Sequence, residues 1–282
     1  MKARILTAAA LVLTTATLFA ADRTFERTLN TGSSPNVSVA TGSGDIHLHP
    51  GSSNQVHIVA NVHANHSFMS GDVDARVQEI VNHPPIVQNG NDIIIGQQHN
   101  NDLYRNISIS YDITLPKSSV LNATSGSGSI HVENVGAGLK AQTGSGDIRA
   151  FGIQGAATLG TGSGSIQFQQ SSPGDVRAET GSGDIQLRGI SGALISRTGS
   201  GGIDVQGQPT SDWKLSTGSG SVRLAVGNAH FNLDADTGSG GIHTAQPIAM
   251  QGQLNRHHVT GAVNGGGPTI RVRTGSGDID IQ

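Results

Sequence analysis

Three histidines near the start of the chain are the residues whose types and spacing come closest to metal chemistry. His47 and His49 are two residues apart, so a strand presents both on one face, and a Pro50-Gly51 turn would pair that strand with the strand of His57. Three converging imidazoles resemble a zinc ligand set, but no carboxylate or cysteine completes it. We therefore interpret His47, His49 and His57 as neutral side chains on a solvated face, and we expect no metal and no cofactor.

Acidic pairs are the second set of candidates, because a polysaccharide hydrolase or lyase needs carboxyl groups that converge from neighbouring strands. Asp184 and Asp204 are the nearest pair, and they are offset along their strands. Asp234 and Asp236 share one strand face, with Lys214 one repeat away together with Ser216. Aromatic residues make up only 3% of the chain, so a sugar groove would lack stacking platforms. We interpret these acids as solvated and predict a protein without catalytic residues.

A glycine-rich hexad, Thr-Gly-Ser-Gly-x-Ile/Val, is the most repeated motif of the chain. It begins at Thr41, Thr143, Thr161, Thr180, Thr198, Thr217, Thr237 and Thr274, with a variant at Ser125. It is not a calcium-binding β-roll, because an aspartate fills its fifth position in only some copies and never in two consecutive ones. It is not a phosphate-binding loop, because no Lys-Ser/Thr follows it and no helix starts there.

The spacing of the hexads predicts a solenoid. From Ser125 they recur in steps of 18 to 20 residues, followed by a step of 37 that we interpret as two coils with one degenerate hexad. A left-handed hexapeptide helix also has 18 residues per coil, but six residues beyond Ile148 and Ile166 lie Gln154 and Ser172 where it needs aliphatic side chains. The fold class is therefore all-β, a parallel β-solenoid of about nine coils of 18–19 residues.

The columns of the repeat indicate which side chains face inward. Aliphatic residues alternate with polar ones on both sides of every hexad, which predicts two short strands per coil. Glu179 and Arg197, one coil apart on an outward face, predict a surface ion pair. The hexad glycines form the corner, where we expect positive φ and close backbone approach. These structural turn residues are Gly144, Gly146, Gly162, Gly164, Gly181, Gly183, Gly199, Gly201, Gly218, Gly220, Gly238, Gly240, Gly275 and Gly277.

Residues 21–120 differ from the regular repeat, which fills residues 121–282. They hold the first coil and a β-rich region that we expect to cap the solenoid, since a parallel stack otherwise ends in an open strand edge. Val73, Val77, Ile80 and Val81 recur at helical spacing and predict one short helix with Ser70 as its N-cap. Asn89-Gly90 predicts a hairpin turn.

The C-terminal part of the chain has a glycine-rich segment and a final strand with predictable roles. Residues 265–268, Gly-Gly-Gly-Pro, predict a tight reversal within a closing meander of strands. An uncovered last strand from Asp278 to Gln282 would invite end-to-end self-association.

Residues 1–20 are typical of a signal peptide. Lys2 and Arg4 precede an uncharged stretch rich in Ala, Leu and Thr, and Ala20-Ala21 offers a cleavage point. Cleavage leaves 15 basic against 20 acidic residues, a net charge of −5. This charge argues against nucleic acid or anionic membrane as partners. No later segment is apolar enough to span a membrane, so we expect export to the periplasm, the outer surface or the medium.

Several of these motifs, taken in order, resemble one known family. The signal peptide, the leading Thr-Gly-Ser-Gly-Asp-Ile, a strand over residues 111–116, the serial Gly-Ser-Gly-x-Ile coils and a terminal Gly-Gly-Gly segment resemble the bacterial "putative adhesin" β-strand-repeat family, a domain of unknown function. The resemblance covers about residues 30–282. It implies an exported or envelope β-solenoid and supplies no catalytic residues.

The sequence thus predicts a non-enzymatic, exported β-solenoid that acts through its surface. An adhesin or another structural or interaction protein of the cell envelope fits this prediction, with cell-surface or envelope components as partners. A carbohydrate-active enzyme of the parallel β-helix type is one alternative. A periplasmic partner in envelope-stress signalling is another.

Overall fold

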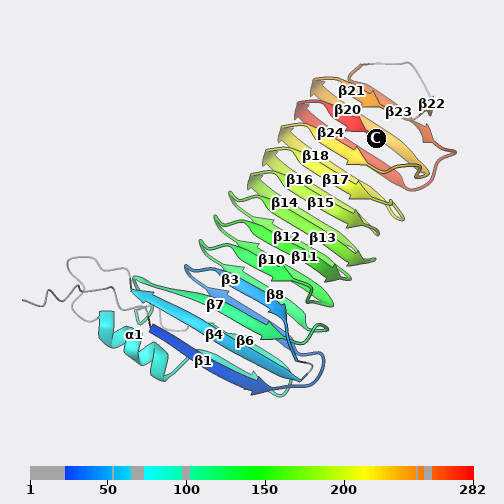
Figure 1. Ribbon diagram of the computed structural model, residues 1–282. Coiled ribbons are helices and arrows are strands. Elements are labelled where there is room, and N and C mark those ends of the chain that lie inside the picture. Colours follow the sequence, from blue (N-terminus) through cyan, green and yellow to red (C-terminus); the bar gives the residue numbers. More distant parts are fainter. Residues whose placement is uncertain (1–22, 53, 65–72, 97–101, 246, 251–255) are drawn as a thin grey trace, which may run out of the picture.

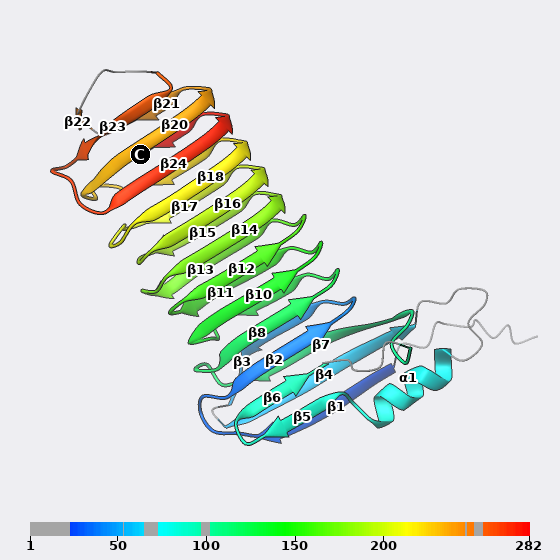
Figure 2. The same ribbon diagram turned by 180° about the vertical axis from the view of Figure 1, so that it is seen from behind.

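The structure is a computed structural model that describes residues 23–52, 54–64, 73–96, 102–245, 247–250 and 256–282. Two long sheets lie face to face and form a rod (Figures 1 and 2). The predicted fold class is confirmed, since coil follows coil as parallel strands in register over most of the rod. The signal peptide predicted for residues 1–20 lies outside the described residues.

Sheet A has twelve strands, and its front face is seen in Figure 1. In spatial order its strands are β1 (Arg23–Asn30), β4 (Gln55–Ala64), β7 (Ile107–Leu115), β3 (Ile46–Pro50), β9 (Ile130–Glu133), β11 (Ile148–Gln154), β13 (Ile166–Ser172), β15 (Ile185–Ile190), β17 (Ile203–Gly207), β19 (Val222–Ala225), β25 (Ile279–Ile281) and β21 (Ile242–Thr244). Its middle strands all begin at the Ile or Val that closes a hexad.

Sheet B has thirteen strands and faces the viewer in Figure 2. In spatial order its strands are β22 (Ile248–Met250), β23 (His258–Val263), β20 (Phe231–Ser239), β24 (Thr269–Ser276), β18 (Trp213–Ser219), β16 (Leu194–Ser200), β14 (Val176–Ser182), β12 (Ala157–Thr161), β10 (Gly138–Thr143), β8 (Val120–Ser125), β2 (Asn36–Thr41), β6 (Asp92–Ile95) and β5 (Ile86–Asn89). Each regular coil therefore runs from sheet B through the hexad corner into sheet A.

The core is a thin layer of aliphatic side chains between the sheets. The inward columns predicted from the repeat are buried along the rod, and the largest side chains among them are Trp213 and Phe168. The indole Nε1 of Trp213 donates to the carbonyl of Gly192 at 2.9 Å, so its one polar atom is satisfied. The pattern weakens only at β21, where Ile242 is half-buried and Thr244 is exposed, because this strand lies at the end of sheet A.

At the N-terminal end, extra strands continue both sheets beyond the first coil. Strands β2 and β3 stack directly on β8 and β9, while β6 and β7 pair with their other edges. The predicted helix is confirmed as α1 (Val73–Asn82), which packs its buried Val73, Val77 and Ile80 near β1 and β4. Its proposed cap Ser70 lies outside the described residues. The Asn89-Gly90 hairpin is confirmed between β5 and β6.

The predicted pairing across the Pro50-Gly51 turn is wrong. Strand β4 pairs with β1 and β7, and β7 separates it from β3. The amide of Gly51 donates to the carbonyl of Leu115 at 2.9 Å, so the chain leaves β3 held against β7. Both edges of β3 are occupied by the parallel strands β7 and β9, which leaves no edge for a hairpin partner.

At the C-terminal end, chain order and spatial order differ. Strand β24 lies between β18 and β20, and β25 lies between β19 and β21. The predicted two coils in the 37-residue step are therefore wrong: after β21 the chain crosses through the antiparallel pair β22 and β23 and then fills the remaining gap. The strand predicted to be uncovered at Asp278 to Gln282 is paired on both sides.

The glycine-rich reversal is present before this returning coil. Asn264, Gly265 and Gly266 have φ of 53°, 93° and 83°, and the amide of Gly266 donates to the carbonyl of Val263. Strands β23 and β24 on its two sides do not pair with each other, because β20 lies between them. Across the described ranges, no helix has the length and apolarity needed to cross a membrane.

Candidate functional site: a polar groove across the coil ends

The Thr and the glycines of the hexad corner are engaged in contacts with the backbone of the neighbouring coil. Thr161 donates its hydroxyl to the carbonyl of Gly146 in the coil before it, at 2.8 Å, and accepts from the amide of Gly164. A Cβ on Gly146 would lie 2.1 Å from the carbonyl oxygen of Gly128. Close approach is thus what these glycines supply. The expected positive φ occurs at some corners, such as Gly201 at 154°, but not at Gly146.

The aspartates after the corner also have a structural partner. Asp147 accepts from the amide of Ser165 at 2.9 Å, and Asp184 accepts from the amide of Gly202 at 2.8 Å, each in the next coil. Two serines at this position do the same: Ser129 accepts from the amide of Asp147, and Ser221 accepts from the amide of Asp278. The column therefore holds adjacent coils together whether the residue is aspartate or serine.

Asp184 and Asp204, the nearest candidate acids, do line one small hollow. It has a volume of about 220 Å³ and also includes Gln186 and Arg223. Asp204 pairs in register with Gln186, so Asp184 lies two residues further back along its strand. Because Asp184 already accepts a backbone amide, the hollow does not present two equivalent free carboxylates.

The three candidate histidines lie apart and make separate contacts. His49 pairs with Asp112, with Nε2 2.6 Å from Oδ1, while His57 lies two strands away beside Thr28 and Glu26. The ring of His47 instead lies against that of His131, their centroids 5.8 Å apart. Among the described residues no group of three or more His, Asp or Glu side chains is placed to hold a metal ion.

His131 extends this histidine-rich area to a carboxylate on its own strand. Its Nε2 lies 2.6 Å from Oε1 of Glu133. This hydrogen bond, together with the nearby imidazoles, holds the pKa of the Glu133 carboxyl below its usual range. Both side chains remain in contact with solvent, so the pair adds little to stability.

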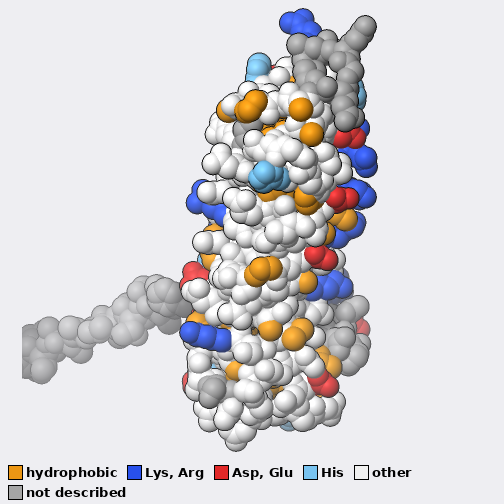
Figure 3. Space-filling model, turned by 90° about the vertical axis from the view of Figure 1, so that its right-hand side faces the viewer, with side chains coloured by type: hydrophobic (Ala, Val, Ile, Leu, Met, Phe, Trp, Pro, Cys, Tyr) orange, Lys and Arg blue, Asp and Glu red, His pale blue; other side chains and the backbone are white. Residues whose placement is uncertain are grey.

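The charged side chains of the rod lie mainly on its two sheet faces. In Figure 3, Lys and Arg side chains gather along the two margins of the rod, and the narrow side facing the viewer carries few. On sheet B, Glu179 bonds Arg177 at 2.8 Å and Arg197 at 3.3 Å, so the predicted ion pair of Glu179 and Arg197 is confirmed.

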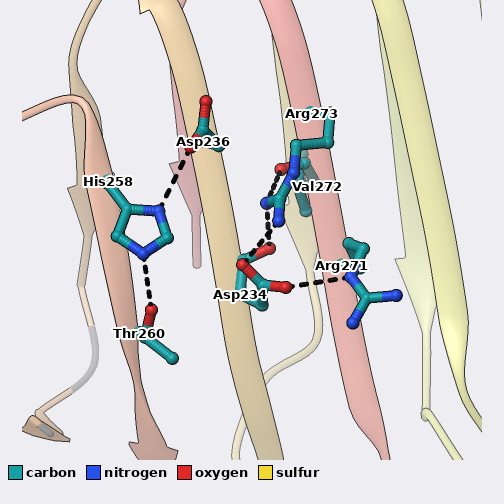
Figure 4. A network of polar contacts seen from close by, with 7 residues as sticks. All are labelled: Asp234, Asp236, His258, Thr260, Arg271, Val272 and Arg273. Atoms are coloured by element: carbon teal, nitrogen blue, oxygen red, sulfur yellow. Dashed lines mark hydrogen bonds and ion pairs between the residues drawn. The ribbon is translucent and has the colours of Figure 1, made fainter.

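Asp234 is the most strongly bound carboxylate on sheet B. Arg271 and Arg273 of the neighbouring strand reach its two oxygens at 2.9 and 2.8 Å (Figure 4). Partial burial raises the pKa of Asp234, but the hydrogen bonds from both guanidinium groups outweigh it and leave that pKa below its usual value. The expected neighbour Lys214 lies one strand further away, because β24 intervenes.

Asp236, on the same face, contacts the antiparallel strand instead. Its Oδ2 lies 3.2 Å from Nδ1 of His258, whose other ring nitrogen lies 3.0 Å from the hydroxyl of Thr260 (Figure 4). The two acids that the sequence placed on one face therefore have different partners, and neither is a free acid or base poised for catalysis.

A hollow larger than the one at Asp184 and Asp204 lies where the strands of sheet A end and the chain leads back to sheet B. We call it the glutamine groove. It has a volume of about 720 Å³ and is lined by Gln169, Arg188, Gly189, Gln206, Gly207, Gln208, Ala225, Val226, Gly227 and Gln282. The volume falls within the range of small-ligand sites, about 300–1,000 Å³.

Strand register explains why these side chains converge. Gln169, Arg188 and Gln206 occupy the same outward column on β13, β15 and β17, so they stand side by side at the spacing of adjacent strands, about 4.8 Å. The register shift between Arg188 and Ile190 bends β15 there. Gln282 enters from the returning C-terminal coil, because β25 pairs with β19.

The long polar side chains of the groove have no partners within the described part of the protein. Within the described ranges, the side chains of Gln169, Arg188, Gln206 and Gln282 are exposed and have no hydrogen-bond or ion-pair partner. The adjacent Gln170, by contrast, is buried and bonds three backbone groups. Amides offer donors and acceptors together, and the guanidinium adds five donors and a positive charge. This combination suits hydroxyl groups and an occasional carboxylate.

Sequence reasoning missed this site. The outward column read from the hexads was the one directly after each closing Ile, where Gln167 and Gln186 stand among unlike residues. The groove uses the next outward column, three residues after the Ile, in which Gln169, Arg188 and Gln206 follow one another. Listing that column would have revealed the amides, whereas the entry of Gln282 depends on the strand order at the C-terminal end.

The chain belongs to the family described as Toastrack DUF4097, a domain of unknown function whose model matches residues 39–282. A solved structure from Bacteroides fragilis, described as a "putative adhesin", is 11% identical and aligns over 93% of this chain and 99% of its own, with a TM-score of 0.45. A "putative lipid binding protein" from Parabacteroides distasonis is 13% identical over 92% and 96% of the two chains, with a TM-score of 0.39. No curated protein matches the chain.

Proposed function

We propose that the protein is an exported, non-enzymatic surface protein that binds glycans of a cell surface or of the envelope through the glutamine groove, in the manner of an adhesin. The observation that carries the proposal is the set of exposed, unpartnered amides and the single guanidinium that converge in a hollow of about 720 Å³. Sugars are rich in hydroxyl groups, and planar amide and guanidinium groups bond them from several directions.

Two further features support a binding role over catalysis. Asp184 is engaged with a backbone amide, and Asp234 is held by two arginines with its pKa below its usual value, which suits an ionised ion-pair partner better than a general acid. The groove itself contains no Asp, Glu or His among its lining residues. It can therefore hold a ligand but offers no acid or base with which to cleave one.

The test is a binding measurement with a double variant. The purified protein is incubated with whole bacterial cells and with isolated envelope polysaccharide, and the bound fraction is compared for the native chain and Arg188→Ala/Gln206→Ala. We expect the variant to lose at least tenfold in affinity with an unchanged melting temperature, since both side chains are exposed. Gln142→Ala, an exposed glutamine on sheet B, is the matched control. Equal binding by the native chain and the double variant would overturn the proposal.

Turnover of the same polysaccharides decides between binding and enzymatic function. We expect no release of reducing ends or unsaturated sugars on prolonged incubation. Release that disappears in Asp204→Asn would instead establish the carbohydrate-active alternative, because Asp204 lines the small hollow without the backbone bond of Asp184. Fractionation of cells into periplasm, outer surface and medium tests the proposed export independently of either result.

A further inference from the structure

The outward face of sheet B carries an excess of positive charge on a chain whose net charge is −3. In the spatial order of sheet B, the strands from β10 through β24 to β20 present six cationic and three acidic side chains on this face. The cations are Lys140, Arg177, Arg197, Lys214, Arg271 and Arg273, and the acids are Glu179, Asp234 and Asp236. Because the chain as a whole is acidic, this face is electrostatically distinct from the rest of the molecule.

Each carboxylate with arginine neighbours is held from two sides. Glu179 lies between Arg177 of its own strand and Arg197 of the next one. Asp234 accepts from both Arg271 and Arg273. The face thus already binds carboxylates by pairs of guanidinium groups, which is the geometry that arginine favours.

One column across this face alternates acid and arginine, with a single gap. In register across neighbouring strands it runs Glu179, Arg197, Ser216, Arg273 and Asp236. Ser216 therefore stands between two arginines, at the position where the alternation calls for a carboxylate. The distance from Arg197 to Arg273 across this gap is two strand spacings, about 9.6 Å between backbones.

Lys214 adds a free cation at the gap. It lies two residues before Ser216 on β18, so it shares the same outward face, and it is exposed. Within the part of the chain that the structure describes, its ammonium has no hydrogen-bond or ion-pair partner. Arg271 stands directly beside it on β24. Four cations therefore lie around Ser216 on β16, β18 and β24. Among the described residues Lys214 is unpaired, whereas the three arginines also bond Glu179 or Asp234 on their sides away from Ser216.

We propose that this gap over β18 binds a carboxylate of an acidic, uronate-bearing polysaccharide that lies along the rod. Lys214, Arg197 and Arg273 bind the carboxylate, and the flanking Arg177 and Arg271 extend the attraction to neighbouring sugar units. The site is on the opposite sheet from the glutamine groove, so it goes beyond the proposed function and is independent of it.

The shape of the charged area favours a linear polymer over other anionic partners. The cations occupy two columns about 7 Å apart that follow the rod axis through several strands. Such a narrow band of charge matches a linear polymer better than the broad surface of an anionic membrane. The two columns contain no aromatic side chain from β10 to β24, so nucleic acid bases would find no stacking partner. Glu179 and Asp234 show that a carboxylate is the group that these arginines bind.

The experiment places a glutamate at position 216, between Arg197 and Arg273. Ser216→Glu completes the alternation, so it should fold normally and block the site. Binding of polygalacturonate to the purified full chain is measured by titration calorimetry at low salt. We expect at least a tenfold loss for Ser216→Glu and for Lys214→Glu, and a decline of native binding as salt rises. Gln167→Glu, which adds the same charge to an outward position on sheet A, is the matched control and should bind as the native chain does.

Ligand controls separate carboxylate recognition from general attraction to anions. Fully methyl-esterified polygalacturonate, which lacks the charge, and polyphosphate should each bind at least tenfold more weakly than polygalacturonate. Native-like binding by Ser216→Glu, or equal binding of polyphosphate, would overturn the inference. A neutral polysaccharide, which has no carboxylate, should bind the native chain and Ser216→Glu equally, because Ser216 lies outside the glutamine groove. Failure of this site and failure of the glutamine groove are therefore read separately.

Discussion

The two turns of a regular coil follow opposite rules. At the hexad corner, every regular coil from residue 121 onward places a Thr, or Ser125, five residues before the closing Ile or Val. The hydroxyl of that residue donates to a glycine carbonyl of the neighbouring coil. At the other turn, the connection from sheet A back to sheet B varies from two residues after β11 to five after β17. The uniform turn holds the stack together, and the variable turn is where the glutamine groove forms. Repetition in this molecule therefore marks structure, and variation marks the surface available for binding.

The largest effect that would test this contrast is a methyl group at the corner. Gly146→Ala places a Cβ 2.1 Å from the carbonyl oxygen of Gly128, and backbone cannot move aside as a flexible side chain can. We expect a loss of about 3 kcal/mol in the free energy of unfolding. Urea unfolding followed by circular dichroism measures it.

The chain offers a matched control for this substitution. Gly42 is the first glycine of the first hexad, and a Cβ there meets nothing within 4 Å. A Cβ on Gly144, the equivalent glycine in the corner of Gly146, would lie 2.3 Å from the carbonyl oxygen of Gly126, so Gly42 is a corner glycine without the close contact. Gly42→Ala should change stability by no more than about 0.5 kcal/mol. If both variants unfold at the same urea concentration, close packing is not what fixes glycine at the corner.

A smaller effect is expected from the corner hydroxyl. Thr161→Val keeps the shape of the side chain but removes the bond to Gly146 and leaves the amide of Gly164 without its acceptor. The expected loss is about 2 kcal/mol. Thr158→Val, at an exposed position on the same strand, should stay within about 0.5 kcal/mol of the native protein. A difference of less than 0.5 kcal/mol between the two variants would contradict a structural role for the hydroxyl column.

The hydroxyl bonds of the corner contain no titrating group, so acid should leave them intact, whereas the ion pair of Asp234 should respond to pH. The pKa of Asp234 lies below its usual value of about 3.9 despite partial burial, because Arg271 and Arg273 bond the ionised form. The stability from this pair is therefore present above that usual value and lost as pH falls through the lower, folded-state pKa. Asp234→Asn should lower the melting temperature slightly at pH 7. The difference in melting temperature between this variant and the native protein should become smaller as the pH falls from 4 to 2. A difference that is constant with pH would exclude this linkage.

The smallest stability effect belongs to the variable turn. Arg188→Ala removes an exposed side chain without a partner in the described ranges, so the melting temperature should be unchanged within the equivalent of about 0.5 kcal/mol. Thermal unfolding of Arg188→Ala and Gly146→Ala side by side compares the smallest and the largest expected loss of stability. A large loss of stability in Arg188→Ala would show that the groove is part of the scaffold.

Much of the fold could be predicted because it follows from local patterns. The period of the hexads, the inward Ile and Val columns, the helix at Val73 and the Asn89-Gly90 turn all depend on residues close in sequence, and all are present. The strand order at the ends could not be predicted in this way. The residues of the hexad at Thr274 do not indicate whether its coil follows the coil of Thr237 or lies between the coils of Thr217 and Thr237. The structure places it between them, and the long crossover through β22 and β23 makes that position possible.

The candidate sites show the same limit. The placement of Glu179 beside Arg197 follows from one period of the repeat and was predictable. The separation of His57 from His49 by β7 depends on a strand more than forty residues later, so the histidines could not be placed by spacing alone. The glutamine groove needed both the second outward column and the position of Gln282.

The insertion of β24 and β25 between earlier coils also sets the order in which the rod can assemble. Regular coils meet neighbours 18 residues away, whereas Ser221 and Asp278 are bonded across 57 residues. Closing the longer loop costs about 1 kcal/mol more in chain entropy. Strands β20 and β21 have no partner on the β18 side until residues 269–282 arrive, so this end should form last and open first. Hydrogen exchange should then be faster in β20 and β21 than in β14 and β15, although all four belong to coils with the same hexad.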